Sequence, residues 1–372
     1  MKPWWLSRAL FEQILPGSRA GHSGPIRARG SITHVIILDG TLSTLAPGEE
    51  TNAGLAYRLL SEMGSSVSLF YESGVQWQDW RATTDVLMGR GINRQIRRAY
   101  GYLASRYRPG DKIFMLGYSR GAYAVRSLAG VIDQIGLLKG DHATERNIMQ
   151  AYRHYQGAPG SKCAQAFSRR FCHSYAPIEM VGVWDTVKAL GIRLPLLWRW
   201  SEHQHAFHNH QLGKSVHKGF HALALNETRR VFEPVLWLCP PELEGKVEQV
   251  WFKGTHGDVG GHVGRHNESR PLSNIPLVWM LDKAEECGMA LPDSWRVRFP
   301  CDATAPSVGT WRAWGKLFVL RGARQVCADP SESLHVTARG HTHAGGLVAR
   351  LRSALFSPYK SMMRWGFGTP GQ

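Results

Sequence analysis

The sequence predicts an α/β fold with a mostly parallel sheet and helices on both of its faces. Short apolar runs rich in β-branched residues alternate with longer amphipathic or apolar segments, which is the pattern of parallel strands joined by crossover helices. The 372 residues are 43% hydrophobic and include 14 Trp, a composition that supports a packed core and excludes a disordered chain. This length fits one large domain with insertions, or two domains.

Each expected strand is a short apolar run, and the five clearest runs cover residues 34–38, 65–73, 111–116, 178–185 and 247–254. Three helices are expected between them, at residues 51–64, 92–107 and 121–138. The first helix begins at a cap near Thr51 or Asn52 and ends at Gly64. The second carries apolar residues on one face and Arg on the other, and the third is apolar along most of its length.

The chain divides into a basic N-terminal extension, one large α/β domain and a basic C-terminal tail, which cover residues 1–31, 32–340 and 341–372. Within the domain, residues 139–175 and 190–215 look like insertions, and both are candidate lids over a site. The second insertion mixes bulky apolar residues, Arg and four His, and an ordinary surface elaboration is its alternative. Near the C-terminus the one expected strand lies at residues 316–320.

The charge of the chain favours acidic partners. The formal net charge is +16, which attracts polyanions such as phospholipid headgroups, nucleic acid or an acidic protein. The basic residues are spread along the chain without a helix-turn-helix or RNA-recognition signature, so we expect an anionic membrane or an acidic protein rather than nucleic acid. The six Cys never form CxxC, which favours reduced thiols over a disulfide frame or a zinc knuckle.

The expected location is cytoplasmic or on the membrane surface. No run of about 18 apolar residues is present, so the sequence predicts no transmembrane segment. The first residues show no signal peptide, and export would follow a route without one. The segment MKPWWLSRALFEQILPG offers an apolar face for a bilayer, with docking on its own domain or on a partner as the alternative.

The strongest functional signal is the stretch IFMLGYSRGAYAVRSLAG. Within it, residues 117–121 match G-x-S-x-G immediately after an expected strand and before an expected helix, the context that a nucleophile elbow requires. A serine on this tight turn needs small neighbours, and the helix N-terminus directs N–H groups at developing negative charge. We therefore predict Ser119 as a nucleophile; with 40 Gly in the chain, the alternative is a chance match in a loop.

The loop after the first strand is expected to complete an oxyanion hole. In α/β-hydrolases this loop follows the strand two before the nucleophile strand, which here gives DGTLST after HVIIL. The backbone N–H of Gly40 or Thr41 is one expected donor, and that of Arg120 is the second. Asp39 braces the loop or the elbow, or caps the turn without a catalytic part. A haloacid-dehalogenase phosphatase is excluded, because Ile37 occupies the position of its nucleophilic carboxylate.

A serine nucleophile needs a base, and the base needs an orienting acid. Asp185 follows the next expected strand, at the sheet edge where sites form, and an N-cap is its alternative role. His256 follows the strand after that in a glycine-rich turn and is the expected base. Asp258 is the rival acid, or a residue that orients the loop. His221 is the rival base, or a buried histidine with satisfied hydrogen bonds.

Two groups of histidines raise the alternative of a metal site. Residues 256–266 read H-x-D-x3-H-x3-H, and four more His lie within residues 203–210. Glycines separate the first group, which indicates a loop rather than a preformed helical face of ligands. We therefore expect neither a metal nor another cofactor.

Several motifs in a fixed order point to a known family: DGT, TNAGLAYRLL, GYSRGAYAVRSLAG, GVWDTVKALG, HALALNETRRVFEPVLW, WFKGTHGDVGGH and ESLHVTAR. Over roughly residues 32–340 the chain resembles the DUF2235 family, α/β-hydrolase-like proteins that include the Tle1-type phospholipase effectors of type VI secretion. The resemblance implies a serine esterase acting on lipid or related esters, with Ser119, Asp185 and His256 at matching positions. One departure is His262, which stands where the family has Gly.

The sequence thus predicts a serine hydrolase that cleaves carboxylic esters, with lipid or phospholipid esters favoured. Ser119 attacks, His256 transfers the proton, Asp185 holds the imidazole, and an acyl-enzyme forms. The alternative is a non-catalytic binding or regulatory protein on a hydrolase scaffold. A third hypothesis is binding of an anionic polymer driven by the net charge.

Overall fold

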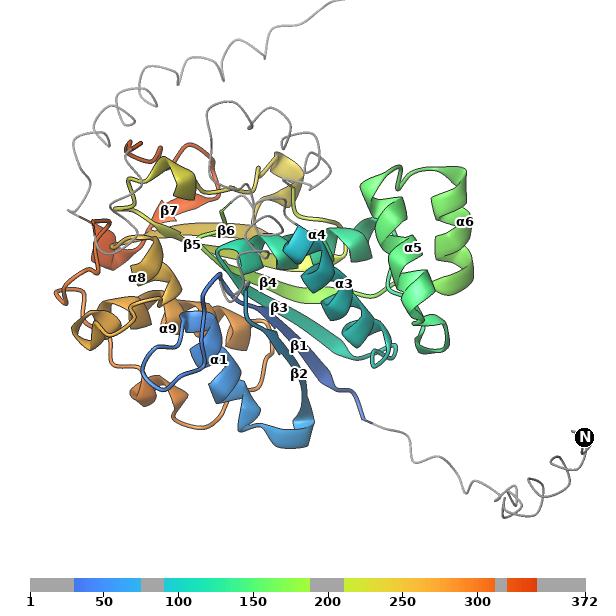
Figure 1. Ribbon diagram of the computed structural model, residues 1–372, viewed down its shortest axis with the longest axis horizontal. Coiled ribbons are helices and arrows are strands. Elements are labelled where there is room, and N and C mark those ends of the chain that lie inside the picture. Colours follow the sequence, from blue (N-terminus) through green and yellow to red (C-terminus); the bar gives the residue numbers. More distant parts are fainter. Residues whose placement is uncertain (1–29, 75–89, 188–210, 312–319, 340–372) are drawn as a thin grey trace, which may run out of the picture. The chain divides into compact units, whose positions relative to one another are not determined.

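The computed structural model describes residues 30–74, 90–187, 211–311 and 320–339 (Figure 1). Within these ranges the strands are β1 (Thr33–Leu38), β2 (Val67–Glu72), β3 (Lys112–Tyr118), β4 (Ile178–Trp184), β5 (Val216–Ala224), β6 (Val247–Phe252) and β7 (Glu332–Leu334). They form one sheet in the order β2-β1-β3-β4-β5-β6-β7, and all neighbouring strands are parallel. The predicted parallel α/β sheet is confirmed.

Helices cover both faces of the sheet (Figure 1). The described α-helices are α1 (Asn52–Ser61), α3 (Arg90–Ala104), α4 (Arg120–Gln134), α5 (Glu145–Gln156), α6 (Lys162–Phe171), α8 (His256–Gly260) and α9 (Arg270–Glu286). Alternate residues of β1 serve the two faces: Ile36 and Leu38 pack with residues of α3 and α4, whereas Val35 and Ile37 pack with residues of α1 and α9. The strand is buried on both sides, which is why it reads as a continuous apolar run.

The local signals explain where the first helix lies. Thr51 is the N-cap of α1, since its Oγ1 accepts a hydrogen bond of 3.0 Å from the Gly54 N–H. This confirms one of the two expected caps. The helix ends at Ser61, before the expected Gly64, and residues 64–66 form a separate short 3-10 turn that leads into β2.

The strand β5 was not among the sequence predictions. Its sequence, VHKGFHALA, begins with two exposed residues after Val216 and contains a glycine and two histidines, so neither alternation nor an apolar run marks it. Its last six residues are nevertheless buried between β4 and β6. The strand after Asp185 is therefore β5, and the strand that leads to His256 is the next one, β6.

The strand order reverses once, between β1 and β3. The chain goes from β1 outward to the edge strand β2, returns to β3 on the other side of β1, and then continues outward to β7. Ligand sites of open α/β sheets form where this reversal occurs, at the carboxyl ends of the strands. The elbow serine follows β3 at that place, so the fold is α/β-hydrolase-like.

The insertion at residues 139–175 forms α5 and α6, which continue from the end of α4. Because α4 starts at Arg120, directly after Ser119, and runs back along the sheet, these helices lie at the opposite end of the strands from the nucleophile (Figure 1). A lid stays a prediction for the second insertion, of which residues 190–210 lie outside the described residues. Residues 1–29, most of the expected strand at 316–320, and residues 340–372 of the tail region also lie outside the described residues, so the expectations for them stay predictions.

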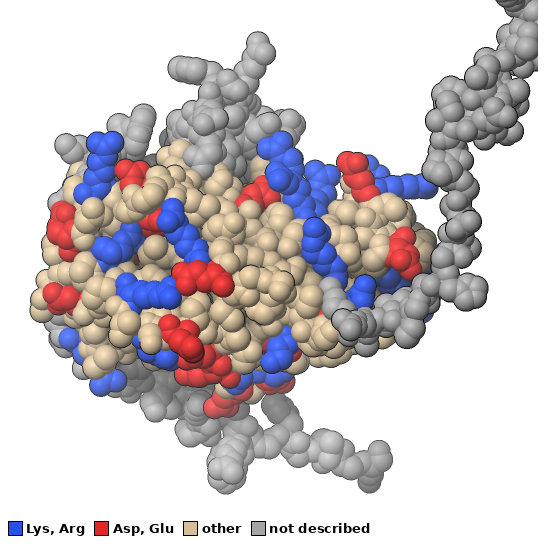
Figure 2. All heavy atoms as spheres, turned by 90° about the horizontal axis from the view of Figure 1, so that it is seen from below, with Lys and Arg blue, Asp and Glu red and all other residues tan. Residues whose placement is uncertain are grey.

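Charges are mixed on the surface that Figure 2 shows, where Lys and Arg side chains stand among Asp and Glu. No helix within the described ranges combines the length and the apolar character needed to cross a bilayer.

Candidate active site

Ser119 lies on a strained turn between β3 and α4. Its backbone angles are φ 57° and ψ −119°, a region that residues other than glycine rarely adopt. Close packing requires the glycine that follows: a Cβ at Gly121 would lie 2.1 Å from the carbonyl oxygen of Leu38. This is the geometry of a nucleophile elbow, which presents the serine hydroxyl at the carboxyl edge of the sheet.

The structure brings Ser119, His256 and Asp185 together from the segments that follow β3, β6 and β4. The Ser119 Oγ lies 2.9 Å from the His256 Nε2, and the His256 Nδ1 lies 2.6 Å from the Asp185 Oδ2. All three side chains are buried, with exposed fractions of 7%, 6% and 0% in that order. With Nδ1 donating to the carboxylate, Nε2 is free to accept the serine proton.

Asp185 is held as a carboxylate. Its Oδ1 accepts a 3.0 Å hydrogen bond from the Ala224 N–H, and the Arg324 guanidinium donates 2.6 Å and 2.9 Å hydrogen bonds to its two oxygens. Burial by itself would raise the pKa of Asp185, but the charge of Arg324 and the hydrogen bonds from His256 and Arg324 lower the pKa below its ordinary value. The acid therefore stays ionised.

Sequence reasoning did not find Arg324. It lies in a stretch without periodicity or motif, and a single arginine in such a stretch carries no signal of a buried partner. Its side chain is 5% exposed in the structure.

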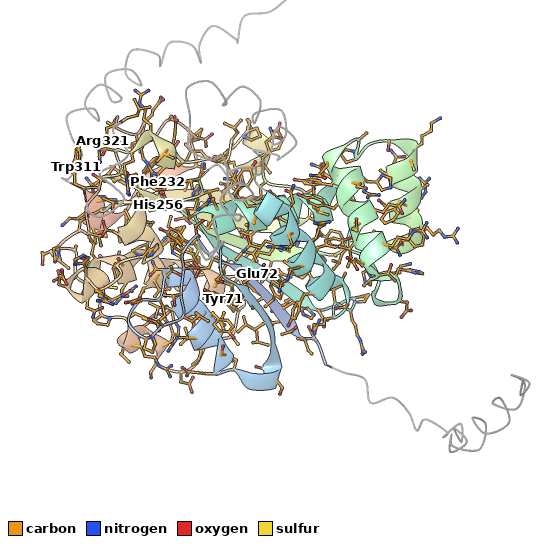
Figure 3. The ribbon with its side chains drawn as sticks, viewed as in Figure 1. Tyr71, Glu72, Phe232, His256, Trp311 and Arg321 are labelled. Carbon is orange, nitrogen blue, oxygen red and sulfur yellow. The ribbon has the colours of Figure 1, made fainter. Side chains whose placement is uncertain are left out.

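Two aromatic rings fix the plane of the His256 imidazole. Phe232 stacks on it with ring centroids 4.6 Å apart and an interplanar angle of 10°, and the two residues lie side by side in Figure 3. Tyr118 lies on another side at 5.0 Å, and its hydroxyl donates a 3.2 Å hydrogen bond to the His256 carbonyl. The ring is thereby limited to orientations that face Ser119 and Asp185.

Glu227 anchors the backbone of the histidine and was also missed from the sequence. Its Oε2 accepts hydrogen bonds from the His256 N–H at 3.1 Å and from Arg229 at 2.7 Å. Burial opposes ionisation of Glu227, but the bonds and charge of Arg229 lower its pKa. The NETRR stretch offered one clue, because a buried glutamate needs such a cationic neighbour.

Asp258, the rival acid, accepts hydrogen bonds from backbone N–H groups and hydroxyls rather than from the His256 imidazole. It forms a capping box with Thr255 at the start of α8, where its Oδ2 accepts hydrogen bonds from the Thr255 N–H at 2.7 Å and Oγ1 at 2.8 Å. It also accepts hydrogen bonds from Ser307 and from the Val308 N–H. The geometry thus favours Asp185 as the residue that orients His256.

His221, the rival base, is a buried residue of β5. Its Nε2 accepts a 3.1 Å hydrogen bond from the Thr186 N–H, and its Nδ1 lies 3.3 Å from the Gln249 Oε1. Burial, helped by the nearby Arg126 charge, lowers the pKa of His221 to about 3. Both ring nitrogens have partners, as the alternative role of His221 requires.

The loop after β1 is braced by Asp39, which is fully buried. Its carboxylate accepts 2.6 Å hydrogen bonds from the Gly40 N–H and the Thr51 hydroxyl, and a 2.8 Å bond from the Tyr71 hydroxyl. Burial raises the pKa of Asp39, although the bonds from Thr51 and Tyr71 oppose this. Since the Gly40 N–H is engaged, Thr41 is the better candidate of the two expected oxyanion donors.

Arg120 begins α4, so its backbone N–H has no acceptor within the helix and is available at the elbow. Its guanidinium is half-buried and has no hydrogen-bond or ion-pair partner among the residues that the structure describes. Burial lowers the pKa of Arg120 to about 10, which still leaves it cationic at neutral pH.

The metal alternative has little geometric basis. Both ring nitrogens of His256 and the carboxylate of Asp258 have the protein partners given above. In the described ranges no group of three or more potential ligands converges, and His203, His205, His208 and His210 lie outside those ranges.

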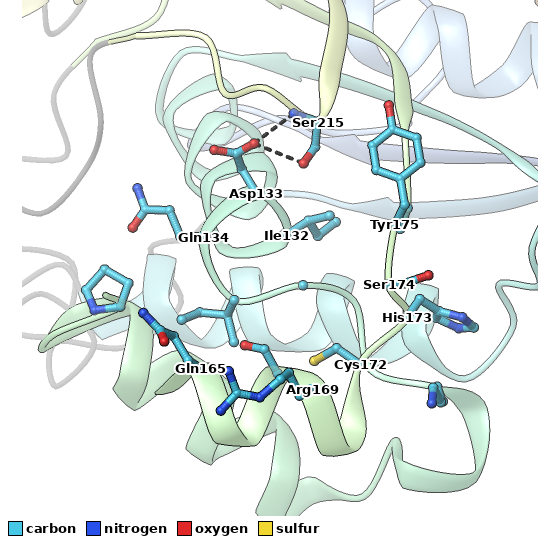
Figure 4. Close-up of a pocket in the computed structure, with 16 residues that line it drawn as sticks. Ile132, Asp133, Gln134, Gln165, Arg169, Cys172, His173, Ser174, Tyr175 and Ser215 are labelled. Atoms are coloured by element: carbon cyan, nitrogen blue, oxygen red, sulfur yellow. Dashed lines mark hydrogen bonds between the residues drawn. The ribbon is translucent and has the colours of Figure 1, made fainter. Parts of the chain in front are cut away.

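A cavity of about 730 Å³ lies away from the triad (Figure 4). The end of α4, part of α6, the segment before β4 and Ser215 line it. Asp133 accepts hydrogen bonds of 2.7 Å and 2.9 Å from the backbone and hydroxyl of Ser215 across one side. Because this cavity is at the amino ends of β4 and β5, it is not part of the serine site.

Comparisons with known proteins give the family. The model of the type VI secretion (T6SS) phospholipase effector Tle1-like catalytic domain matches residues 33–283. "Uncharacterized protein YEL023C" of Saccharomyces cerevisiae is 30% identical over 183 residues, which are 42% of this chain and 27% of that protein. The chain thus spans little more than a quarter of the curated relative it matches.

Two solved structures show a weak overall likeness. One is an uncharacterized protein from Pseudomonas aeruginosa, with a TM-score of 0.42, 16% identity, and coverage of 74% of this chain and 50% of that chain. The other is the Tle1 effector bound to the VgrG spike of the type VI secretion system, with a TM-score of 0.32, 18% identity, and coverage of 66% and 56%. The family assignment rests on the match to residues 33–283, which is more than half of the chain. The chain belongs to the family of Tle1-like type VI secretion phospholipase effector catalytic domains, which confirms the resemblance seen in its motifs.

Proposed function

We propose that the chain is a serine hydrolase that cleaves carboxylic esters of phospholipids or related lipids through an acyl-enzyme. The observation that carries the proposal is the pair of short contacts from Ser119 Oγ to His256 Nε2 at 2.9 Å and from His256 Nδ1 to Asp185 Oδ2 at 2.6 Å. Such a chain of groups lets a serine hydroxyl lose its proton as it attacks.

Acylation follows from these positions. The Ser119 Oγ attacks the ester carbonyl carbon while its proton passes to the His256 Nε2, and Asp185 stabilises the imidazolium that forms. The N–H groups of Arg120 and Thr41 stabilise the oxyanion. His256 then returns the proton to the departing alcohol oxygen, the ester C–O bond breaks, and the acyl group remains on Ser119.

Deacylation repeats the sequence with water. His256 takes a proton from the water as its oxygen attacks the acyl carbon, and then gives a proton to the Ser119 Oγ as the fatty acid leaves. Protein groups and water are sufficient for both halves, so the proposal includes no cofactor.

Three observations support a phospholipid as the substrate. The family is named for phospholipase effectors. The Arg120 guanidinium, next to the nucleophile, is half-buried and unpaired within the described part of the chain, and a substrate phosphate would pair with it. The net charge of +16 favours contact with an anionic bilayer. For location we propose the membrane surface of a target, reached through type VI secretion.

The test compares wild type with Ser119→Ala on short- and long-chain nitrophenyl esters and on phospholipid vesicles. We expect Ser119→Ala to lower kcat/KM by at least about 10⁴-fold, because the nucleophile is lost while the oxyanion donors remain. Ser61→Ala, at the exposed end of α1, is the matched control and should keep wild-type rates.

A fluorophosphonate probe gives an independent readout, since it labels only an activated serine. Labelling of wild type but not of Ser119→Ala is expected. Wild type that hydrolyses no ester and takes no label would replace this proposal with the binding scaffold. Faster turnover of vesicles than of soluble esters would identify a lipase.

A further inference from the structure

We propose that Arg324 is a positioning residue of the triad, which holds the Asp185 carboxylate in the orientation that His256 requires. The inference rests on the proposed Ser119–His256–Asp185 mechanism. It assigns a role to a residue well beyond residue 283, where the family match ends.

Arg324 and Asp185 form a bidentate ion pair, a fork in which each terminal nitrogen donates to one carboxylate oxygen. Arg324 Nη1 donates to the Asp185 Oδ1 at 2.6 Å, and Nη2 donates to Oδ2 at 2.9 Å. The exposed fractions are 5% for the guanidinium side chain and 0% for the carboxylate. A planar guanidinium fixes a carboxylate in one plane, which a lysine with its single rotatable ammonium group does not.

Each terminal nitrogen of the same guanidinium has a second hydrogen-bond partner. Nη1 also donates to the carbonyl of Ala224 at 2.9 Å, and Nη2 donates to the carbonyl of Phe232. Ala224 is the residue whose N–H binds Asp185, and Phe232 is the ring stacked on His256. Arg324 therefore joins the end of β5, the acid and the residue that supports the base into one rigid unit.

This arrangement has an electrostatic consequence for the base. A cation on the far side of Asp185 opposes the attraction between the carboxylate and a protonated imidazole. Loss of this cation should therefore strengthen that attraction and change the pH dependence of the rate. In the described part of the chain, the other titratable or charged groups that face His256 or its immediate supports include Tyr118, Glu227, Arg229 and His262.

The experiment measures the rate of fluorophosphonate labelling and kcat/KM on a nitrophenyl ester against pH, in the full chain. We expect Arg324→Gln to lower both by about 10- to 100-fold, the usual effect of removing a partner that orients a working ligand or acid. We also expect the acid limb of both profiles to move to higher pH. Arg324→Lys should keep the acid limb near its wild-type position and restore only part of the rate, because the charge remains and the fork is lost.

Arg321→Gln is the matched control. Arg321 belongs to the same segment, donates to Thr310 and Thr228, and lies over the Trp311 ring (Figure 3). It should lower thermal stability without moving the acid limb. If Arg324→Gln behaves as Arg321→Gln does, Arg324 is only structural and the inference is wrong. Should the Gln variant not fold, Arg324→Lys decides: a wild-type rate would overturn the role of the fork.

A double-mutant cycle separates this inference from the proposed function. If Arg324 acts through Asp185, Asp185→Asn with Arg324→Gln should be no slower than Asp185→Asn alone. Effects that multiply would overturn the inference while the proposed function stands. Wild type that takes no fluorophosphonate would instead remove the proposed function itself.

Discussion

At the scale of single residues, the site contains two buried carboxylates, Asp185 and Asp258, that both follow strands but make different contacts. Asp185 lies 2.6 Å from the His256 Nδ1 and is paired with Arg324, whereas Asp258 accepts hydrogen bonds from the backbone and hydroxyl of Thr255. The first arrangement can stabilise an imidazolium. The second stabilises the start of a helix.

Substitution of each carboxylate by its amide should separate these roles. Asp185→Asn is expected to lower kcat by about 10³- to 10⁴-fold, because an amide cannot orient and stabilise the imidazolium. Asp258→Asn should cost about 1–2 kcal/mol of stability through the weakened cap, with a much smaller change in kcat. Kinetics at neutral pH together with urea unfolding measure both effects, and the reverse pattern would make Asp258 the acid.

The sequence predicts a site residue only where a motif or a regular strand or helix pattern surrounds that residue. Ser119 was predicted as the nucleophile because a strand, a five-residue motif and a helix all indicate one position. Asp185 and His256 were predicted because each follows a strand. Glu227 and Arg324 support these residues through contacts that arise from distant parts of the chain, and no periodicity in the sequence encodes such contacts.

At the scale of elements, α8 is a short helix that the sequence did not predict, because its glycines favoured a turn. Residues around His256 were expected in a glycine-rich turn, but His256–Gly260 form one helical turn with Thr255 as its cap. Thr255 followed three residues later by Asp258 is a capping-box pattern, so this signal was present in the sequence. The short helix fixes His256 at its first position.

The strand β5 places the neutral imidazole of His221 in the interior of the protein. As a result, the free energy of unfolding of the protein should depend on pH. Burial lowers the pKa of His221 to about 3 in the fold, whereas an unfolded histidine titrates near its ordinary value of 6.5. Between these values the unfolded chain binds a proton that the folded chain does not bind. The free energy of unfolding should therefore fall as pH falls from 6.5 toward 3.

His221→Gln should remove this dependence. Between pH 6.5 and pH 4 we expect wild type to lose roughly 3 kcal/mol more stability than the variant, from a depressed pKa of this size in a fully buried group. His217→Gln is the control, because His217 lies on the same strand, is exposed and pairs with Glu179. Chemical denaturation across this pH range measures the slopes. Equal slopes for wild type and His221→Gln would show that His221 is not the group responsible.

At the scale of the whole molecule, the charge distribution predicts a salt-sensitive contact with lipid. The net charge of +16 is spread along the sequence, and residues 1–31 carry Lys2, Arg8, Arg19, Arg27 and Arg29 against Glu12. Each basic residue near an anionic surface contributes about 1 kcal/mol at physiological salt. The described face in Figure 2 mixes both signs, which fits a diffuse attraction better than one focused patch.

Removal of residues 1–31 should weaken binding to phosphatidylserine vesicles and reduce its dependence on salt. Hydrolysis of a soluble nitrophenyl ester should be unchanged, since no triad residue lies in this segment. Vesicle co-sedimentation from low to high NaCl measures the first effect, with neutral phosphatidylcholine vesicles as the control. Equal binding by both chains would assign the lipid contact to residues after 31.

The sequence by itself determined the parallel sheet, the elbow with Ser119, the cap at Thr51 and the candidate triad, because these depend on contiguous runs and on short motifs. Tertiary structure alone decided the placement of β5, the contact of Asp185 rather than Asp258 with the His256 imidazole, the engagement of the Gly40 N–H by Asp39, and the pairing of Arg324 with Asp185. The physical reason is the same in each case. A buried charge or a weakly marked strand is stabilised by partners far away in the chain, and such partners are known only when the sheet has brought them together.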